Sequence, residues 1–320
     1  MKLLVKLVFI LFYIFGGLIF LTPFFVKNFV AECVARIWFY LVPIKKKILL
    51  LNLSFVFQRK AQESMEEYRE RLEHLALRNM HHTFLCVLEL FERFHWDDRT
   101  LQKKTVIEGN EFFQAQVRAG QGFFILTAHL GNWELITRVG AFLKIRLHII
   151  TKNLRNSLFN DLWVQSRKRY GLALLKEEGS GVQVLRSIEK GASVGFILDQ
   201  HTGLPHGMKV KFFGVDAWSP KGLAILSSRM EVPVLWSFIK RLPDGRHFVK
   251  IGPPIDFSLL NAPQFRNAKG HLNEEGQKAH IEICNALIEK FVQECPEQYL
   301  WIHKRFKETR DYKQRLVWEL

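Results

Sequence analysis

The sequence predicts an α/β protein with a central mixed, mostly parallel sheet flanked by helices, preceded by an N-terminal transmembrane or interfacial helix. Three observations support this. A twenty-residue uncharged run lies near the N-terminus, helical patterning follows to residue 96, and short apolar runs alternate with helical stretches thereafter. We therefore divide the 320 residues into an anchor over 1–28, interfacial and amphipathic helices over 29–100, and an α/β domain over 101–320.

The first element to justify is the N-terminal run from Leu7 to Val26. Its twenty uncharged residues, as a helix rising about 1.5 Å per residue, reach across the roughly 30 Å hydrocarbon core of a bilayer. A signal peptide is the alternative, but its apolar core normally has about 7–15 residues and a small-residue cleavage site follows it. The stretch from Trp38 to Leu53, with Lys45–Lys47 inside it, indicates either an interfacial helix on anionic headgroups or an ordinary core helix.

The next elements follow from periodicity and turn residues. Residues 54–96 predict one long or two shorter amphipathic helices, in which His81 and His82 are structural because adjacent helix residues point about 100° apart. Asp244-Gly245 predicts a hairpin turn. The expected strands are 123–127, 147–151, 194–198, 232–239 and 247–251, and the expected helices are 134–143, 156–169 and 276–295.

Composition limits the class of protein and its partners. The 48% hydrophobic and 13% aromatic content excludes intrinsic disorder. The four cysteines lack metal-ligand spacing and fit reduced thiols facing the cytosol. The net charge of +15 indicates an anionic partner, which is nucleic acid, an acidic protein or a phosphate-bearing lipid surface.

Two predicted strand ends carry polar side chains where active residues of α/β sheets gather. After the strand 123–127, His129 lies on a turn containing Gly131 and Asn132, and Glu134 falls in the first turn of the next helix. There the carboxylate of Glu134 can accept a hydrogen bond from the imidazole and stabilise its protonated form. No Ser or Cys nucleophile stands in a GxSxG context, so His129 is expected to activate a hydroxyl of the substrate. The alternative is a structural histidine at a strand end.

The second strand end is Leu198-Asp199-Gln200. Asp199 either supports another residue of the site, binds substrate hydroxyls or is the N-cap of a turn. Further on, Ser219 as N-cap and Pro220 at the first helical position predict a helix start, where Lys221 adds positive charge for a phosphate. The alternative is a capped helix with one exposed lysine.

The ordered set of motifs resembles the late lauroyl/myristoyl acyltransferases of bacterial lipid A biosynthesis, within the H-x4-[D/E] acyltransferase superfamily. The resemblance covers almost the whole chain. The motifs are the uncharged N-terminal run, Val106–Gly109, Ile125–Glu134, Asn153, Ser166–Gly171, Asp199-Gln200, Phe212–Gly214 with Gly222, and Gln298–Lys307.

This resemblance implies transfer of an acyl chain from acyl carrier protein to a hydroxyl of a lipid A precursor of the Kdo-lipid IVA type. It also implies a single-pass anchor in the inner membrane, contact with its phospholipid, a cytoplasmic catalytic domain and no nucleic acid. The H-x4-[D/E] signature falls on His129 and Glu134, with backbone amides of Gly131 and Asn132 near the oxyanion. No cofactor is expected, because the thioester donor is already activated.

The expected substrate contacts are Asn132, Arg167, Arg169, Asp199, Gln200 and Lys221. The two arginines are candidates for acceptor phosphates, since guanidinium groups bind phosphate oxygens bidentately, or else solvated helix charges. The loop 201–206 and Lys304-Arg305 depart from the family's usual pattern, which leaves the acceptor open. Absence of a Pro-Glu-Gly motif disfavours a phosphatidic acid-forming enzyme. The alternatives are an acyltransferase for another glycolipid or polar lipid, and a non-catalytic, membrane-anchored basic binding protein.

Overall fold

The computed structural model describes residues 2–42, 44–151, 160, 164, 167, 172–176 and 179–309. The predicted helix 156–169 lies outside these residues apart from three isolated positions, and Arg169 lies outside them as well.

A seven-stranded sheet forms the centre of the molecule, in the order β1-β9-β8-β2-β5-β3-β4. Every pairing is parallel except β8 with β9, so the predicted mixed, mostly parallel sheet is confirmed. The hairpin at Asp244-Gly245 is also confirmed, and Gly245 adopts a φ of +86° there. The strands are β1 (Thr105–Glu108), β2 (Phe123–Thr127), β3 (Leu147–Thr151), β4 (Ala173–Lys176), β5 (Ser193–Ile197), β8 (Val234–Arg241) and β9 (His247–Gly252).

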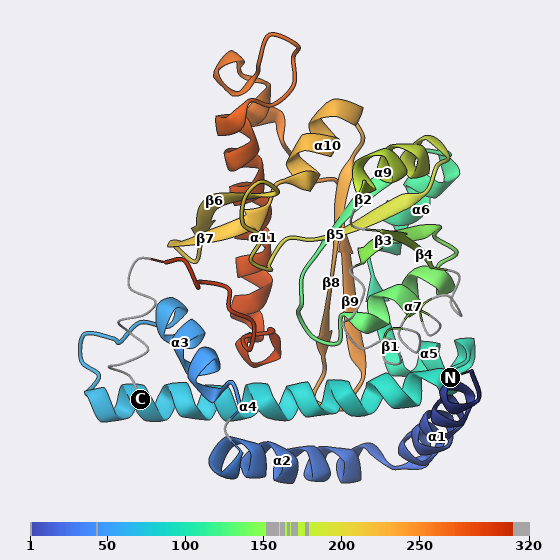
Figure 1. Ribbon diagram of the computed structural model, residues 1–320, viewed down its shortest axis with the longest axis vertical. Coiled ribbons are helices and arrows are strands. Elements are labelled where there is room, and N and C mark those ends of the chain that lie inside the picture. The colour runs from blue at the N-terminus through green and yellow to red at the C-terminus, as the bar shows by residue number, and fades with distance from the viewer. Residues whose placement is uncertain are drawn as a thin grey trace.

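Helices cover both faces of this sheet (Figure 1). On β2, Phe124 and Leu126 join one hydrophobic core, whereas Phe123 and Ile125 join the other, because successive strand residues point to opposite faces. Both sides are therefore buried, which explains the unbroken apolar run. The described helices of the α/β region are α5 (Asp98–Lys104), α6 (Asn110–Arg118), α7 (Glu134–Phe142), α9 (Ser180–Glu189), α10 (Gly222–Met230) and α11 (Glu274–Glu294), with 3₁₀ turns η2 (Ser258–Asn261), η3 (Pro263–Phe265) and η4 (Pro296–Gln298).

The predicted helix start at Ser219 is wrong. Residues 215–220 form β7 (Val215–Pro220), which pairs antiparallel with β6 (Gly207–Phe212), and α10 begins at Gly222 without a side-chain cap. The hydroxyl of Ser219 instead accepts a hydrogen bond from Arg305 at 2.6 Å. A buried arginine from the C-terminal segment thus uses the hydroxyl that the sequence suggested for capping.

One long helix, α4 (Met65–Glu92), supports the edge of the domain and continues into η1 (Arg93–His95). It begins with a capping box in which Ser64 and Glu67 satisfy each other's backbone amides. α4 contacts α1 (Lys2–Leu21), α2 (Phe24–Leu41) and α3 (Lys46–Val56). Figure 1 shows α4 between the sheet and the two blue N-terminal helices.

The N-terminal helices differ from the expected single span. No one helix with described side chains is long and apolar enough to cross a membrane, and the pair that passes jointly, Val8–Leu21 with Phe24–Leu41, is bent by 114°. The core-helix alternative is right for α3, because every residue from Leu49 to Phe55 is buried.

Candidate active site

The site is built at the carboxyl ends of the neighbouring parallel strands β2 and β5. Their register pairs Thr127 with Ile197, and His129 and Asp199 each stand two residues further along. The Nδ1 atom of His129 lies 2.9 Å from Oδ1 of Asp199, and the backbone amide of His129 donates to Oδ2 at 2.8 Å. Asp199 therefore fixes both the main chain and the ring of His129.

The charge state of Asp199 sets the tautomer of His129. Burial raises the pKa of Asp199, but the charge of the His129 imidazolium and the hydrogen bonds from His129 outweigh burial and hold this pKa below its usual value. An ionised carboxylate only accepts, so Nδ1 of His129 carries a proton, and in the neutral form of the ring Nε2 then carries the lone pair. The side-chain amide of Gln200 lies 3.1 Å from this Nε2 atom and donates to it. The lone pair needed by a general base is thus held by a neutral donor that a substrate hydroxyl can replace.

Glu134 is bound elsewhere. Its carboxylate accepts from Arg167 at 2.6 Å and from Arg93 at 3.2 Å. Burial raises the pKa of Glu134, but the two guanidiniums lower it by a larger amount, so the pKa lies below its usual value. The expected hydrogen bond between Glu134 and His129 is absent from the described contacts, because Asp199 occupies Nδ1 and the arginines occupy the carboxylate. This is a correction to the predicted pairing.

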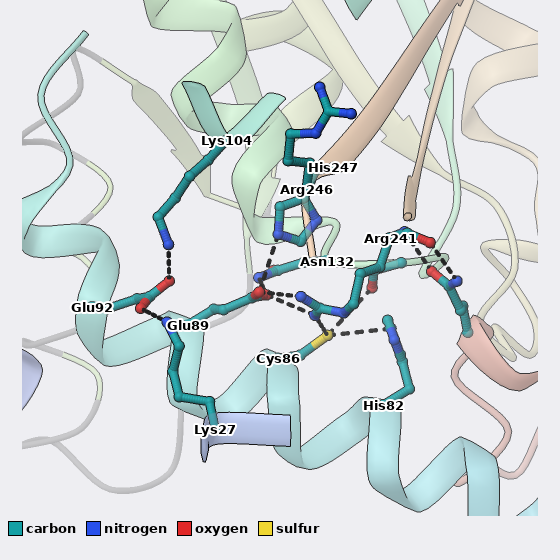
Figure 2. Close-up of polar contacts among 12 residues, drawn as sticks. Lys27, His82, Cys86, Glu89, Glu92, Lys104, Asn132, Arg241, Arg246 and His247 are labelled. Carbon is teal, nitrogen blue, oxygen red and sulfur yellow. Dashed lines mark hydrogen bonds and ion pairs between the residues drawn. The ribbon is translucent and has the colours of Figure 1, made fainter. Parts of the chain in front are cut away.

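The turn after His129 contacts a buried ionic network through the side chain of Asn132 (Figure 2). Glu89 of α4 accepts from both terminal nitrogens of the Arg241 guanidinium and, at 3.1 Å, from Nε2 of His247. Asn132 completes this set by donating its side-chain amide to Glu89 at 2.6 Å. Burial raises the pKa of Glu89, but Arg241 and His247 lower it to well below its usual value, so the carboxylate stays ionised.

The C-terminal segment holds the same turn from another side. The amide of Gly131 donates to the carbonyl of Gln298 at 2.9 Å, and the amide of Leu300 donates to the carbonyl of His129 at 3.0 Å. Gly131 has a φ of +57°, and an added Cβ would overlap the carbonyl oxygen of Ile239. The Gly131 amide is therefore occupied, which corrects its expected role at an oxyanion, while the Asn132 amide makes no backbone hydrogen bond with the described residues.

The remaining predicted site residues have different surroundings. Asn132 is buried, with its side chain turned to Glu89. Arg167 pairs with Glu134 and also lies 3.3 Å from the Thr151 hydroxyl. Lys221 is partly exposed next to α10, and its amide donates to the carbonyl of His206 at 3.1 Å.

Sequence reasoning missed several charged residues that hold the site. Glu89 and Arg93 fall in an apolar helical stretch, Arg241 at a strand end and Arg305 in the C-terminal motif. All four are buried. For Glu89, Arg93 and Arg241 the available signal was a charged residue at a position that the helical or strand period assigns to the core, whereas Arg305 lies in a turn and has no such period.

A histidine oriented by a buried carboxylate at the carboxyl edge of a mostly parallel sheet defines an α/β enzyme site suited to general-base chemistry on a hydroxyl. Comparison with known proteins gives the family. The model of the bacterial lipid A biosynthesis acyltransferase family matches residues 1–308, and the chain belongs to that family.

Three curated relatives come from Escherichia coli K12. The chain is 24% identical over 265 residues to the lipid A biosynthesis palmitoleoyltransferase, covering 82% of this chain and 79% of the relative. It is 23% identical over 271 residues to the lauroyltransferase, with coverage of 82% and 79%. It is 24% identical over 274 residues to the myristoyltransferase, with coverage of 83% and 78%. The resemblance predicted from the motifs is confirmed.

Proposed function

We propose that this chain is an O-acyltransferase that transfers a fatty acyl chain from acyl carrier protein to a hydroxyl of a lipid A precursor. The observation that carries the proposal is the His129–Asp199 pair, whose tautomer leaves Nε2 of His129 as a base at the carboxyl edge of the sheet. Family membership and the names of the relatives support an acyltransferase in lipid A biosynthesis.

The proposed reaction begins when the acceptor hydroxyl displaces the Gln200 amide from Nε2 of His129. As the hydroxyl proton passes to Nε2, the oxygen attacks the thioester carbonyl and a tetrahedral intermediate forms. Collapse of that intermediate breaks the carbon–sulfur bond, and the imidazolium returns the proton to the leaving thiolate. The products are an ester on the acceptor and the free thiol of the carrier protein, so the proton and the acyl group balance.

Each nearby group has a defined part in this proposal. Asp199 orients His129 and balances the positive charge that develops on its ring. The unoccupied amide of Asn132 is the candidate donor to the oxyanion, in place of the occupied amide of Gly131. Glu134 holds the guanidiniums of Arg167 and Arg93 in fixed positions, and Arg167 is the candidate for an acceptor phosphate.

The test is acyl transfer by purified protein from lauroyl-carrier protein to a Kdo-lipid IVA-type acceptor. His129→Ala is expected to abolish turnover, whereas His271→Ala, at a half-buried histidine in the loop before α11, leaves it unchanged. Wild-type turnover by His129→Ala would refute the mechanism. Mass spectrometry of lipid A from cells with and without the gene tests the acceptor, because an unchanged acyl count contradicts it.

A further inference from the structure

A side-chain amide occupies the basic nitrogen of His129. Gln200, which follows Asp199 beyond the carboxyl end of β5, places its amide nitrogen 3.1 Å from Nε2 of His129. The imidazole side chain is 12% exposed, and the Trp133 ring packs against it edge-on with the centroids 5.0 Å apart. A hydroxyl must reach the lone pair of Nε2 to be activated. The Gln200 amide therefore holds the position that an attacking oxygen has to take.

The main chain that carries this amide is fixed. The peptide group between Gln200 and His201 is held at both ends. Its N–H donates to Nε2 of His303 at 2.9 Å, and its oxygen accepts from Nη1 of Arg305 at 3.4 Å. Arg305 is itself buried. The amide can therefore leave Nε2 and return by rotation about the side-chain bonds of Gln200, without a movement of the loop.

An uncharged amide is suited to block Nε2 of His129 reversibly. Its N–H donates to the lone pair without adding a charge beside the imidazolium that forms during transfer. One net hydrogen bond changes an equilibrium by about three- to tenfold, which the binding energy of a large substrate exceeds. The block is therefore weak enough to permit turnover and strong enough to slow a competing reaction.

We propose that Gln200 protects the acyl donor from hydrolysis by holding Nε2 of His129 until the acceptor arrives, an inference that rests on the proposed function. A lipid acceptor has groups remote from its hydroxyl, and their binding energy can displace the amide. Water has no such groups, so it meets the hydrogen-bonded nitrogen without a compensating contact. Gln200 is therefore the residue that selects an acceptor hydroxyl over water.

The reaction that Gln200 suppresses is hydrolysis of the donor thioester. In this reaction a water oxygen attacks the carbonyl carbon while one proton of the water passes to Nε2 of His129. The carbon–sulfur bond then breaks and the imidazolium gives that proton to the thiolate, which yields a free fatty acid and the thiol of the carrier protein. The base and the donor are the same as in transfer, so access to Nε2 separates the two outcomes.

The first test measures access to Nε2 without an acyl substrate. Diethyl pyrocarbonate modifies unprotonated imidazole nitrogens, and mass spectrometry of peptides follows its rate at His129. Gln200→Ala and Gln200→Met, neither of which can donate the hydrogen bond, should both raise this rate about three- to tenfold. Gln121→Ala, at an exposed glutamine before β2 and so at the opposite end of that strand, should leave it unchanged. Wild-type rates in both Gln200 variants, or an increase with alanine alone, would overturn the proposal.

The second test measures the two products. Purified full-length protein is incubated with lauroyl-carrier protein, and free laurate is quantified with and without a Kdo-lipid IVA-type acceptor. Gln200→Ala should raise acceptor-free hydrolysis about three- to tenfold. The kcat for transfer at saturating acceptor should change little, because the bound acceptor has already displaced the amide. Unchanged or slower hydrolysis by folded Gln200→Ala, with Gln200→Met as the second variant, overturns the proposal.

Gln200→Glu should act in the opposite direction. Carboxylates at both ring nitrogens hold His129 as an imidazolium, so hydrolysis and modification by diethyl pyrocarbonate should both fall by about tenfold or more. An increase in either rate would overturn the proposal. Absence of both transfer and hydrolysis in the wild type and in Gln200→Ala would refute the proposed function. Transfer by the wild type with unchanged hydrolysis in Gln200→Ala would refute the role of Gln200 alone.

Discussion

The Asp199→Asn variant tests the orientation of the catalytic base most directly. The carboxylate has two acceptor oxygens, and two N–H groups of His129 use them at 2.8 and 2.9 Å. An amide of the same shape has one acceptor oxygen. When that oxygen keeps the backbone N–H, the amide NH₂ faces Nδ1 of the ring and favours the tautomer protonated on Nε2. The base then loses its lone pair.

The magnitude follows from the charge that the imidazole acquires. At a charge separation of about 4 Å and an effective dielectric constant of about 20, the carboxylate stabilises an imidazolium by about 4 kcal/mol. Because about 1.36 kcal/mol corresponds to a factor of ten in rate, we expect kcat to fall about 1,000-fold. KM for the acceptor should change little, since Asp199 acts through His129.

The assay is initial-rate acyl transfer over a range of acceptor concentrations. Asp256→Asn, at an exposed aspartate outside the site, is the matched control and should keep wild-type kcat. Thermal unfolding of both variants separates a chemical defect from a folding defect. A kcat within threefold of the wild type for folded Asp199→Asn, or a loss confined to KM, would refute the orienting role.

Three further predictions concern the framework. Glu89→Ala leaves Arg241 buried without its anion and should lower the free energy of unfolding by about 3–5 kcal/mol, as measured by urea titration. The control Glu70→Ala, at an exposed position of the same helix, should change this free energy by less than about 0.5 kcal/mol. Gly131→Ala introduces a Cβ that overlaps backbone and should lower both melting temperature and turnover; wild-type values contradict the close approach. Burial lowers the pKa of His82 and of His280 from about 6.5 in the unfolded chain to about 3 in the folded protein. Between these two pH values the unfolded chain therefore binds more protons than the folded protein. The free energy of unfolding should therefore fall as pH drops from about 6.5 towards 3, by about 2 kcal/mol per histidine at pH 5. The double variant His82→Asn His280→Asn should flatten this pH dependence in urea titrations.

The strands were predictable because their signal is local. The run 123–127 is apolar throughout and ends in polar residues, which is typical of a strand buried on both faces, and it matches β2. The helix predicted from Ser219 shows the limit of local reasoning. A Ser-Pro pair suits a helix start, but here its residues end a hairpin strand and the hydroxyl serves Arg305, 86 residues away.

The partner of His129 was not predictable from spacing along the chain. Glu134 is five residues away, and Asp199 is seventy residues away. Strand register decides between them, because β2 and β5 are parallel neighbours and each catalytic candidate stands two residues beyond the pair Thr127 and Ile197. Knowledge that these two strands are adjacent would have been enough to predict the pair. That adjacency depends on the topology of the whole sheet.

The long helix α4 explains why an apolar N-terminal segment and a catalytic turn belong to one mechanical unit. Glu89 and Glu92 are three residues apart and lie on neighbouring positions of the helix, yet one binds the site network and the other binds Lys27 of α2. Buried ion pairs are costly to break on either side, so a displacement of α2 is opposed by the same helix that positions Asn132. The distance between α2 and the turn that bears His129 is therefore set by the width of α4 and not by a flexible linker.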